Sequence, residues 1–166
     1  SLRPDLQVEA LRGNVDTRLR RLDAGELDAI LLAVAVLSRL GYGPRIDAAL
    51  PLTLSLPAVG QGALAVQCRG DDEAPRRRLS VLDHADTHDA IRGERAFLAG
   101  LEGNCRTPLA AHAQLHGDEV ALEGWLATDE TSANPVLHRG ERRGPRVQSA
   151  ALGASLAAEL KQRAHQ

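Results

Sequence analysis

In the first half of the chain, the order of apolar and polar residues predicts four short strands. Residues 6–11 and 52–56 alternate between apolar and polar side chains, which is the period of a half-buried strand. Residues 27–33 form an apolar run, which is typical of a strand buried on both faces of a parallel sheet. Residues 63–68, which follow a glycine-rich stretch, also have the pattern of a strand.

Two helices are expected between these strands. Residues 16–25 should form a short helix, with Asn14 or Asp16 as its N-cap and Gly25 as the left-handed residue that ends it. Residues 34–40 should form the other helix. A strand, a helix and a second strand within about thirty residues is the βαβ arrangement of an α/β domain.

The second half of the chain predicts a small α+β unit, with a three-stranded antiparallel sheet and covering helices. Residues 71–82 and 86–101 are expected to be helical. A final amphipathic helix should run from residue 147 to residue 164. The predicted strands are residues 109–115, 120–127 and 135–142, and the predicted apolar face of the last helix consists of Val147, Ala151, Leu152, Leu156 and Leu160.

The composition is that of a globular protein rather than a disordered one, with 43% hydrophobic and 25% charged residues. A net charge of −2 and very few aromatic residues argue against a nucleic-acid surface. The longest apolar runs are too short to span a bilayer. The two cysteines form no CxxC pair, so we expect a reducing, cytoplasmic setting. Because methionine is absent, we expect a fragment of a longer chain.

Cys105 is the candidate reactive cysteine. It lies between Gly103 and Pro108 in a loop that links a predicted helix to the predicted sheet, and the neighbouring Arg106 should favour its thiolate form. A lone loop cysteine is more often without a special role, so the local sequence leaves both interpretations open. Cys68 lies in a predicted apolar strand and is expected to be a structural residue.

Three arginines are candidates for an anion-binding site. Arg12 precedes the first predicted helix and Arg18 lies within its first turns, where free N–H groups and the helix dipole attract anions. Arg39 follows an apolar run, where a crevice at the carboxyl edge of a sheet would bind ligands. A solvated surface position is the alternative for each of them.

His84 and His88 are four positions apart, so they would share one helical face as metal ligands. The residues between them do not follow the HExxH pattern, and the sequence offers no evident third ligand. We therefore expect no metal site.

Three segments carry a more specific pattern. They are residues 11–19 (LRGNVDTRL), 56–64 (LPAVGQGAL) and 94–108 (ERAFLAGLEGNCRTP). In this order, and over essentially the whole chain, they resemble the porphobilinogen deaminases, also called hydroxymethylbilane synthases. The resemblance implies a transferase of tetrapyrrole (porphyrin and haem) biosynthesis. Such enzymes condense four porphobilinogen molecules head to tail, with release of ammonia, into linear hydroxymethylbilane.

The resemblance also implies roles for single residues. Cys105 matches the cysteine that holds a dipyrromethane primer through a thioether, so dipyrromethane is the expected cofactor. The matched arginines bind the acetate and propionate groups of the primer and of the growing chain. A matched Gln-Gly pair lies at a hinge where the chain crosses between domains, beside the active-site cleft. These matched positions are Arg12, Arg18 and Arg39 for the arginines and Gln61 and Gly62 for the hinge.

The family has three domains, two of which resemble periplasmic binding proteins. By this match, residues 1–62 are the second half of the periplasmic-binding-protein-like central α/β domain, residues 63–80 return to the first domain, and residues 81–166 are the C-terminal α+β domain. The match also implies porphobilinogen as the substrate and a monomeric complete enzyme, with no nucleic-acid or membrane partner.

Nearly all of the family's first domain has no counterpart in this sequence, and the family's catalytic aspartate belongs to that domain. We therefore expect no catalytic residue in this chain and no activity of the fragment alone. Val36 stands where the family usually has glycine, and Asn104 where glycine or serine is commoner. The alternative function is a non-catalytic anion-binding module of the periplasmic-binding type, which the three arginines would also suit.

Overall fold

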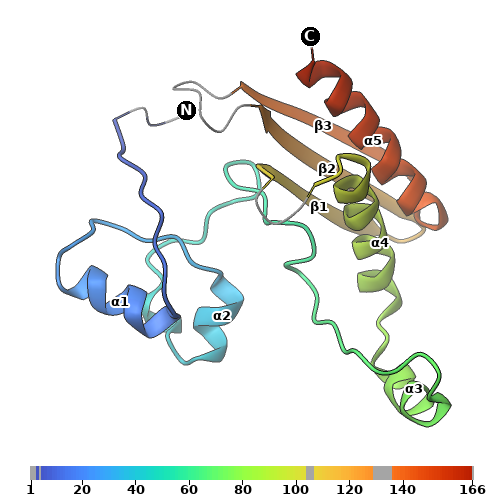
Figure 1. Cartoon of the computed structure of the whole chain (residues 1–166), viewed down its shortest axis with the longest axis horizontal. Coiled ribbons are helices and arrows are strands. Elements are labelled where there is room, and N and C mark those ends of the chain that lie inside the picture. The colour runs from blue at the N-terminus through green and yellow to red at the C-terminus, as the bar shows by residue number, and fades with distance from the viewer. Residues whose placement is uncertain (1–2, 4, 104–106, 129–135, 166) are drawn as a thin grey trace. The chain divides into compact units, whose positions relative to one another are not determined.

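The parts of the chain that the computed structural model describes (Figure 1) are residue 3 and residues 5–103, 107–128 and 136–165. They fall into two compact units, Ser1–Pro51 and Leu52–Gln166. The domain boundaries predicted at residues 62 and 80 stay predictions. In the described parts, no helix is both long and apolar enough to cross a membrane.

The first unit contains the helices α1 (Val15–Asp23) and α2 (Val34–Arg39) and the 3-10 turn η1 (Gly43–Arg45). The side-chain oxygen of Asn14 accepts a hydrogen bond of 2.8 Å from the backbone N–H of Thr17, so Asn14 is the N-cap of α1. Gly25 follows α1 with a φ of +70°, which is the left-handed conformation predicted for the end of this helix. Both helices predicted for this half are confirmed.

Polar contacts join η1 to α1. The Tyr42 hydroxyl, directly before η1, donates a hydrogen bond of 2.6 Å to the Asp16 carboxylate of α1. Arg45 of η1 forms an ion pair with Asp23 at the end of α1. These two links hold η1 to the helix whose apolar side buries Leu19.

The link to Asp16 gives a measurable change in titration. Its hydrogen bond, and then its charge, raise the pKa of Tyr42 above the ordinary value of about 10. The bond is therefore present below that pH and is lost as the pH rises through the raised pKa of Tyr42. We expect Asp16→Asn to lower the midpoint of the ultraviolet titration, which reports on Tyr42 alone because the chain has one tyrosine. The control Asp28→Asn removes an exposed carboxylate of the same unit and should change nothing, and equal midpoints in all three proteins would contradict the link.

None of the four strands predicted for the first half is present among the described residues. A strand needs a neighbour to satisfy its backbone N–H and C=O groups, and the described elements offer these segments none. Their apolar side chains are correspondingly exposed, to 92% for Val8, 78% for Leu31 and 77% for Leu64. The strand prediction was wrong for residues 6–11, 27–33, 52–56 and 63–68.

The second unit is an α+β domain, as predicted. Its elements in chain order are α3 (Glu73–Leu79), the 3-10 turn η2 (Ser80–Leu82), α4 (Ala85–Gly100), β1 (Leu109–His116), β2 (Glu119–Thr128), β3 (Val136–Pro145), the 3-10 turn η3 (Arg146–Gln148) and α5 (Ser149–Ala164). The three strands form an antiparallel sheet in the order β1-β2-β3. Helices α4 and α5 lie side by side over one face of this sheet (Figure 1). The core between the helices and the sheet contains the large, fully buried side chains of Phe97, Leu122, Leu156 and Leu160.

The buried face of α5 differs in part from the predicted one. Leu156 and Leu160 are buried as expected. Val147 is 76% exposed, because α5 begins at Ser149 and Val147 lies in η3. Ala151 is exposed as well, so the prediction was wrong at both positions. Small residues, Gly153 and Ala157, take their place in the buried face.

Candidate cofactor-binding site

Arg18 is fixed at the beginning of α1. Its Nε donates a hydrogen bond of 2.9 Å to the carbonyl oxygen of Gly13. Gly13 has a φ of +115°, a backbone conformation that favours glycine. The chain turns at this residue into the start of the helix. The guanidinium of Arg18 is therefore held next to the N-terminus of α1, which carries a partial positive charge.

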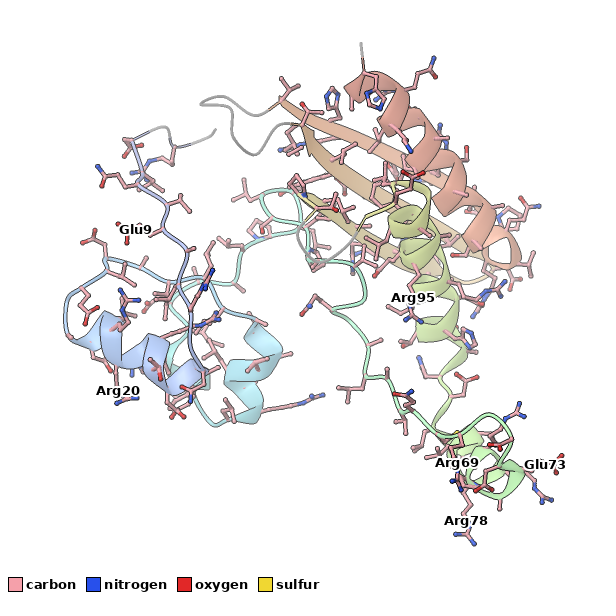
Figure 2. All side chains as sticks on the ribbon, viewed as in Figure 1. Glu9, Arg20, Arg69, Glu73, Arg78 and Arg95 are labelled. Atoms are coloured by element: carbon pink, nitrogen blue, oxygen red, sulfur yellow. The ribbon has the colours of Figure 1, made fainter. Side chains whose placement is uncertain are left out.

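Arg12 and Arg39 lie on the same unit, before α1 and at the last residue of α2, and both are exposed. Within the described parts of the chain, neither side chain forms an ion pair or a hydrogen bond. Other arginines of this unit are engaged: Arg21 pairs with Glu26, and Arg20, labelled in Figure 2, bonds to its own helix. Two of the three predicted carboxylate-binding arginines are thus uncommitted.

Free guanidinium groups are not confined to these positions. Arg78 of α3 and Arg95 of α4, both labelled in Figure 2, also lack a side-chain partner in the described parts of the structure. An uncommitted arginine is therefore compatible with a carboxylate site without identifying one. Such positions provide controls for the experiments below.

Gln61 and Gly62, the predicted hinge, lie in an exposed turn of the second unit. The Gln61 N–H donates to the Ala58 carbonyl oxygen at 3.2 Å, and the Ala63 N–H donates to the Gly60 carbonyl oxygen at 3.3 Å. The turn is therefore formed by two successive local hydrogen bonds, with no regular strand on either side.

Glu94, the first residue of the motif at residues 94–108, is buried at 4% exposure. Its Oε2 accepts a hydrogen bond of 2.8 Å from the Gly60 N–H, and its Oε1 accepts one of 3.0 Å from the Ala113 N–H. The available signal was its spacing, since Glu94 stands three residues before the core residue Phe97 on the same helical face. Spacing alone does not show what a buried carboxylate binds.

Cys105 lies outside the described residues, together with Asn104 and Arg106. Both sides of this short gap are fixed. The Gly103 N–H donates to the Leu98 carbonyl oxygen at 3.0 Å at the end of α4, and the Ala127 N–H of β2 donates to the Pro108 carbonyl oxygen at 2.9 Å. The described residues on either side of Cys105 are therefore hydrogen-bonded to the second unit.

Cys68 differs from its prediction as a buried structural residue. It is an exposed, free thiol, because the strand expected at residues 63–68 is not formed. Two thiols must therefore be distinguished by experiment. Exposure alone does not select Cys105 as the anchor of a cofactor.

The histidines of α4 have local structural roles. His84 caps the helix, since its Nδ1 accepts from the Thr87 N–H at 3.3 Å, and His88 lies 3.3 Å from a carboxylate oxygen of Asp83. Among the described residues, no three His, Cys, Asp or Glu side chains are grouped as metal ligands.

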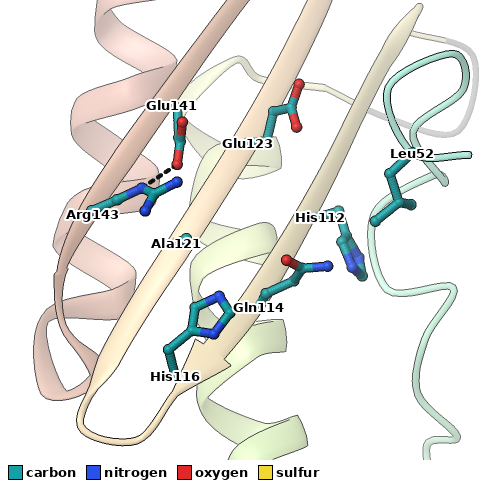
Figure 3. A pocket seen from close by; sticks show the side chains of 8 residues that line it. All are labelled: Leu52, His112, Gln114, His116, Ala121, Glu123, Glu141 and Arg143. Carbon is teal, nitrogen blue, oxygen red and sulfur yellow. Dashed lines mark hydrogen bonds and ion pairs between the residues drawn. The ribbon is translucent and has the colours of Figure 1, made fainter.

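A shallow cavity of about 160 Å³ lies on the sheet face that points away from α4 and α5 (Figure 3). Its charged side chains include Glu123 and an ion pair between Glu141 and Arg143. Next to it, the Arg139 guanidinium lies 4.2 Å from the centre of the Trp125 ring. None of the described site residues predicted from the sequence lines this cavity.

The residues present fit a cofactor rich in carboxylates. Arg12 and Arg39 offer guanidinium groups without protein partners, and Arg18 is held at a helix N-terminus. Guanidinium groups bind carboxylates through paired, charge-assisted hydrogen bonds. Dipyrromethane carries acetate and propionate groups, so its chemistry suits these donors.

Comparison with known proteins agrees with this assignment. The family model described as "Porphobilinogen deaminase, dipyromethane cofactor binding domain" matches residues 1–77, and the one described as "Porphobilinogen deaminase, C-terminal domain" matches residues 89–162. The porphobilinogen deaminase of Geobacter metallireducens is 43% identical over 159 residues, which are 96% of this chain and 49% of that relative. The chain belongs to the porphobilinogen deaminase family. It spans about half the length of this curated relative.

Family membership confirms the resemblance drawn from the three motifs. The dipyrromethane cofactor is confirmed as well, since the first family model is described by its binding. The three arginines and the Gln61–Gly62 turn lie within the match at residues 1–77, and Cys105 lies within the match at residues 89–162. The roles of these single residues stay predictions.

Proposed function

We propose that this chain is part of a hydroxymethylbilane synthase, a transferase that condenses four porphobilinogen units with loss of ammonia. The observation that carries the proposal is the consecutive match of two porphobilinogen deaminase models along the chain. The primer, when bound, supplies the pyrrole end on which the product grows. The catalytic aspartate would come from the remainder of the enzyme, which leaves this chain inactive alone.

In this proposal the chain's own residues hold the primer and its extension. Cys105 anchors dipyrromethane through a thioether. Arg12, Arg18 and Arg39 bind the carboxylates, and the uncommitted state of Arg12 and Arg39 supports this role. The Gln61–Gly62 turn borders the site as a hinge.

The proposed architecture is a periplasmic-binding-protein-like α/β domain that residues 1–62 complete, a return segment at residues 63–80, and the C-terminal domain at residues 81–166. The exposed apolar side chains of the unformed strands support it, because a partner sheet would cover them. We propose that the complete enzyme is a cytoplasmic monomer with no nucleic-acid or membrane partner. Sedimentation of the complete enzyme tests the monomeric state.

The function is tested with the complete protein and porphobilinogen. We expect release of a linear tetrapyrrole with four equivalents of ammonia per product, and an intact mass that exceeds the sequence mass by the primer. Binding of porphobilinogen without turnover would instead favour the alternative, an anion-binding module. If the protein neither binds porphobilinogen nor turns it over, both functions are rejected.

The arginine roles give a separate prediction. Arg12→Ala or Arg39→Ala should lower kcat/KM for porphobilinogen about tenfold to a hundredfold, because a hydrogen bond to a charged group contributes about 1.5–3 kcal/mol. Arg78→Ala is the matched control, since Arg78 is also exposed and without a described partner but lies on α3. Equal losses in the control and the two variants would show that net charge, and not a site, is responsible.

A further inference from the structure

A buried carboxylate joins three separate parts of the second unit. Glu94 projects from α4, and its two oxygens accept hydrogen bonds from the Gly60 N–H at 2.8 Å and the Ala113 N–H at 3.0 Å. The side chain is 6% exposed, so water does not replace these donors easily. A buried carboxylate is tolerated only where hydrogen bonds compensate for its lost hydration, and both of its oxygens are used here.

The two donors are amides that the secondary structure leaves free. β1 is at the edge of the sheet, so the Ala113 N–H that points away from β2 has no strand to bond to. Gly60 stands outside any helix or strand and has a φ of +79°, which favours glycine. Glu94 therefore satisfies an edge amide and a turn amide at once.

Apolar contacts bring the same segment to the domain. Val59, directly before Gly60, is partly buried and packs against the core of the domain. The chain then leaves at Gln61 and Gly62, which are exposed. Glu94 thus holds the chain at Gly60, between the packed Val59 and the exposed Gln61 and Gly62.

We propose that Glu94 is a positioning residue that fixes the 58–63 turn to the C-terminal domain. The consequence for catalysis rests on the proposed function: the chain that crosses between domains would then move together with the end of α4, which precedes Cys105 in the sequence. α4 makes this link, because it contains Glu94 and ends at Gly100, five residues before Cys105. His112 Nδ1 lies 3.9 Å from Glu94 Oε1, which is beyond hydrogen-bond distance but within ion-pair distance when the imidazole is protonated.

The first test needs no variant. Amide hydrogen exchange at single-residue resolution, measured on the complete enzyme, should show a protected Gly60 N–H. Gly62 is the internal control, since it lies in the same exposed turn and no described group accepts its N–H. We expect Gly60 to exchange at least about tenfold more slowly than Gly62. Equal rates at the two glycines would overturn the anchor.

The second test is Glu94→Gln, which keeps the size of the side chain but turns one acceptor into an NH2 group that faces an N–H. Exchange should then rise about tenfold at whichever of the two amides, Gly60 or Ala113, faces the NH2 group. Glu119→Gln, at the exposed start of β2, is the matched control and should leave exchange unchanged. Unchanged exchange at both Gly60 and Ala113 in Glu94→Gln would overturn the proposal.

Kinetics separate positioning from binding. Glu94→Gln should lower kcat about tenfold while KM for porphobilinogen stays within about twofold, because misplacement affects the reacting geometry more than the first binding step. An unchanged kcat with a loosened turn would overturn the positioning role. If the wild-type enzyme has no deaminase activity, the proposed function fails, whereas the comparison of Gly60 with Gly62 still decides the anchor.

Discussion

Replacing Gly153 by valine should prevent the C-terminal domain from folding, or lower its free energy of unfolding by about 4 kcal/mol or more. Gly153 lies where α5 crosses α4. A Cβ at this position would be 2.2 Å from the carbonyl oxygen of Gly93 and 3.0 Å from the backbone nitrogen of Phe97. Both atoms belong to the backbone of α4, so no side chain can rotate away, and the helices would have to separate.

Separation of the helices opens the core, since α4 contributes Phe97 and α5 contributes Leu156 to the same cluster. The loss should therefore exceed the roughly 1–3 kcal/mol usual for overpacking between side chains. Urea unfolding followed by fluorescence measures it, because Trp125 is the one tryptophan of the chain and is 7% exposed in β2.

Ala158→Val is the matched control for this prediction. It adds two methyl groups to an exposed position of α5, so it should change stability by less than about 1 kcal/mol. Gly153→Ala should already be destabilising, because the clash comes from the Cβ itself. A Gly153→Val protein as stable as the control would show that the helices do not cross as closely as described.

The C-terminal domain could be predicted in outline because its signals are local and its partners lie nearby in the sequence. Turn residues such as Gly117 separate the strands, and Val120, Leu122 and Leu126 of β2 stand at even spacing, which places them on one face of a strand. The face of α5 was harder to predict. Hydrophobic periodicity favours large side chains such as Val147, whereas the packing uses Gly153, which carries no hydrophobic signal.

The strands of the first half show the opposite case. The apolar run at residues 27–33 has the pattern of a buried strand, yet its backbone is not in a strand. The hydrophobic pattern shows which side chains a segment can bury, whereas the backbone hydrogen bonds of a strand require a neighbouring strand. Helix α1 does not have this dependence, because its hydrogen bonds and its Asn14 cap are internal to the segment.

The candidate site was predictable to different degrees. Local chemistry made Arg18 a plausible anion ligand, and the structure places it at a helix N-terminus. Cys105 gained its role from the family motif and not from its surroundings. Glu94 could not be found from sequence, because a buried glutamate and a solvated one look alike until the donors at Gly60 and Ala113 are located.

Cys105→Ser should remove the dipyrromethane adduct from the complete enzyme and reduce turnover of porphobilinogen below detection. A serine hydroxyl is a far weaker nucleophile than a thiolate, so it should not form the bond that holds the primer. The measurement is intact mass, with peptide mapping to locate the adduct, together with a turnover assay on the same preparation.

Cys68→Ser is the decisive control, because Cys68 is the exposed, free thiol of the described chain. If access to solvent were enough for primer attachment, this variant would lose the adduct. The proposal requires the reverse: full adduct and full turnover in Cys68→Ser, and neither in Cys105→Ser. An adduct that maps to Cys68 would move the anchor to the segment before α3 and refute the role of Cys105.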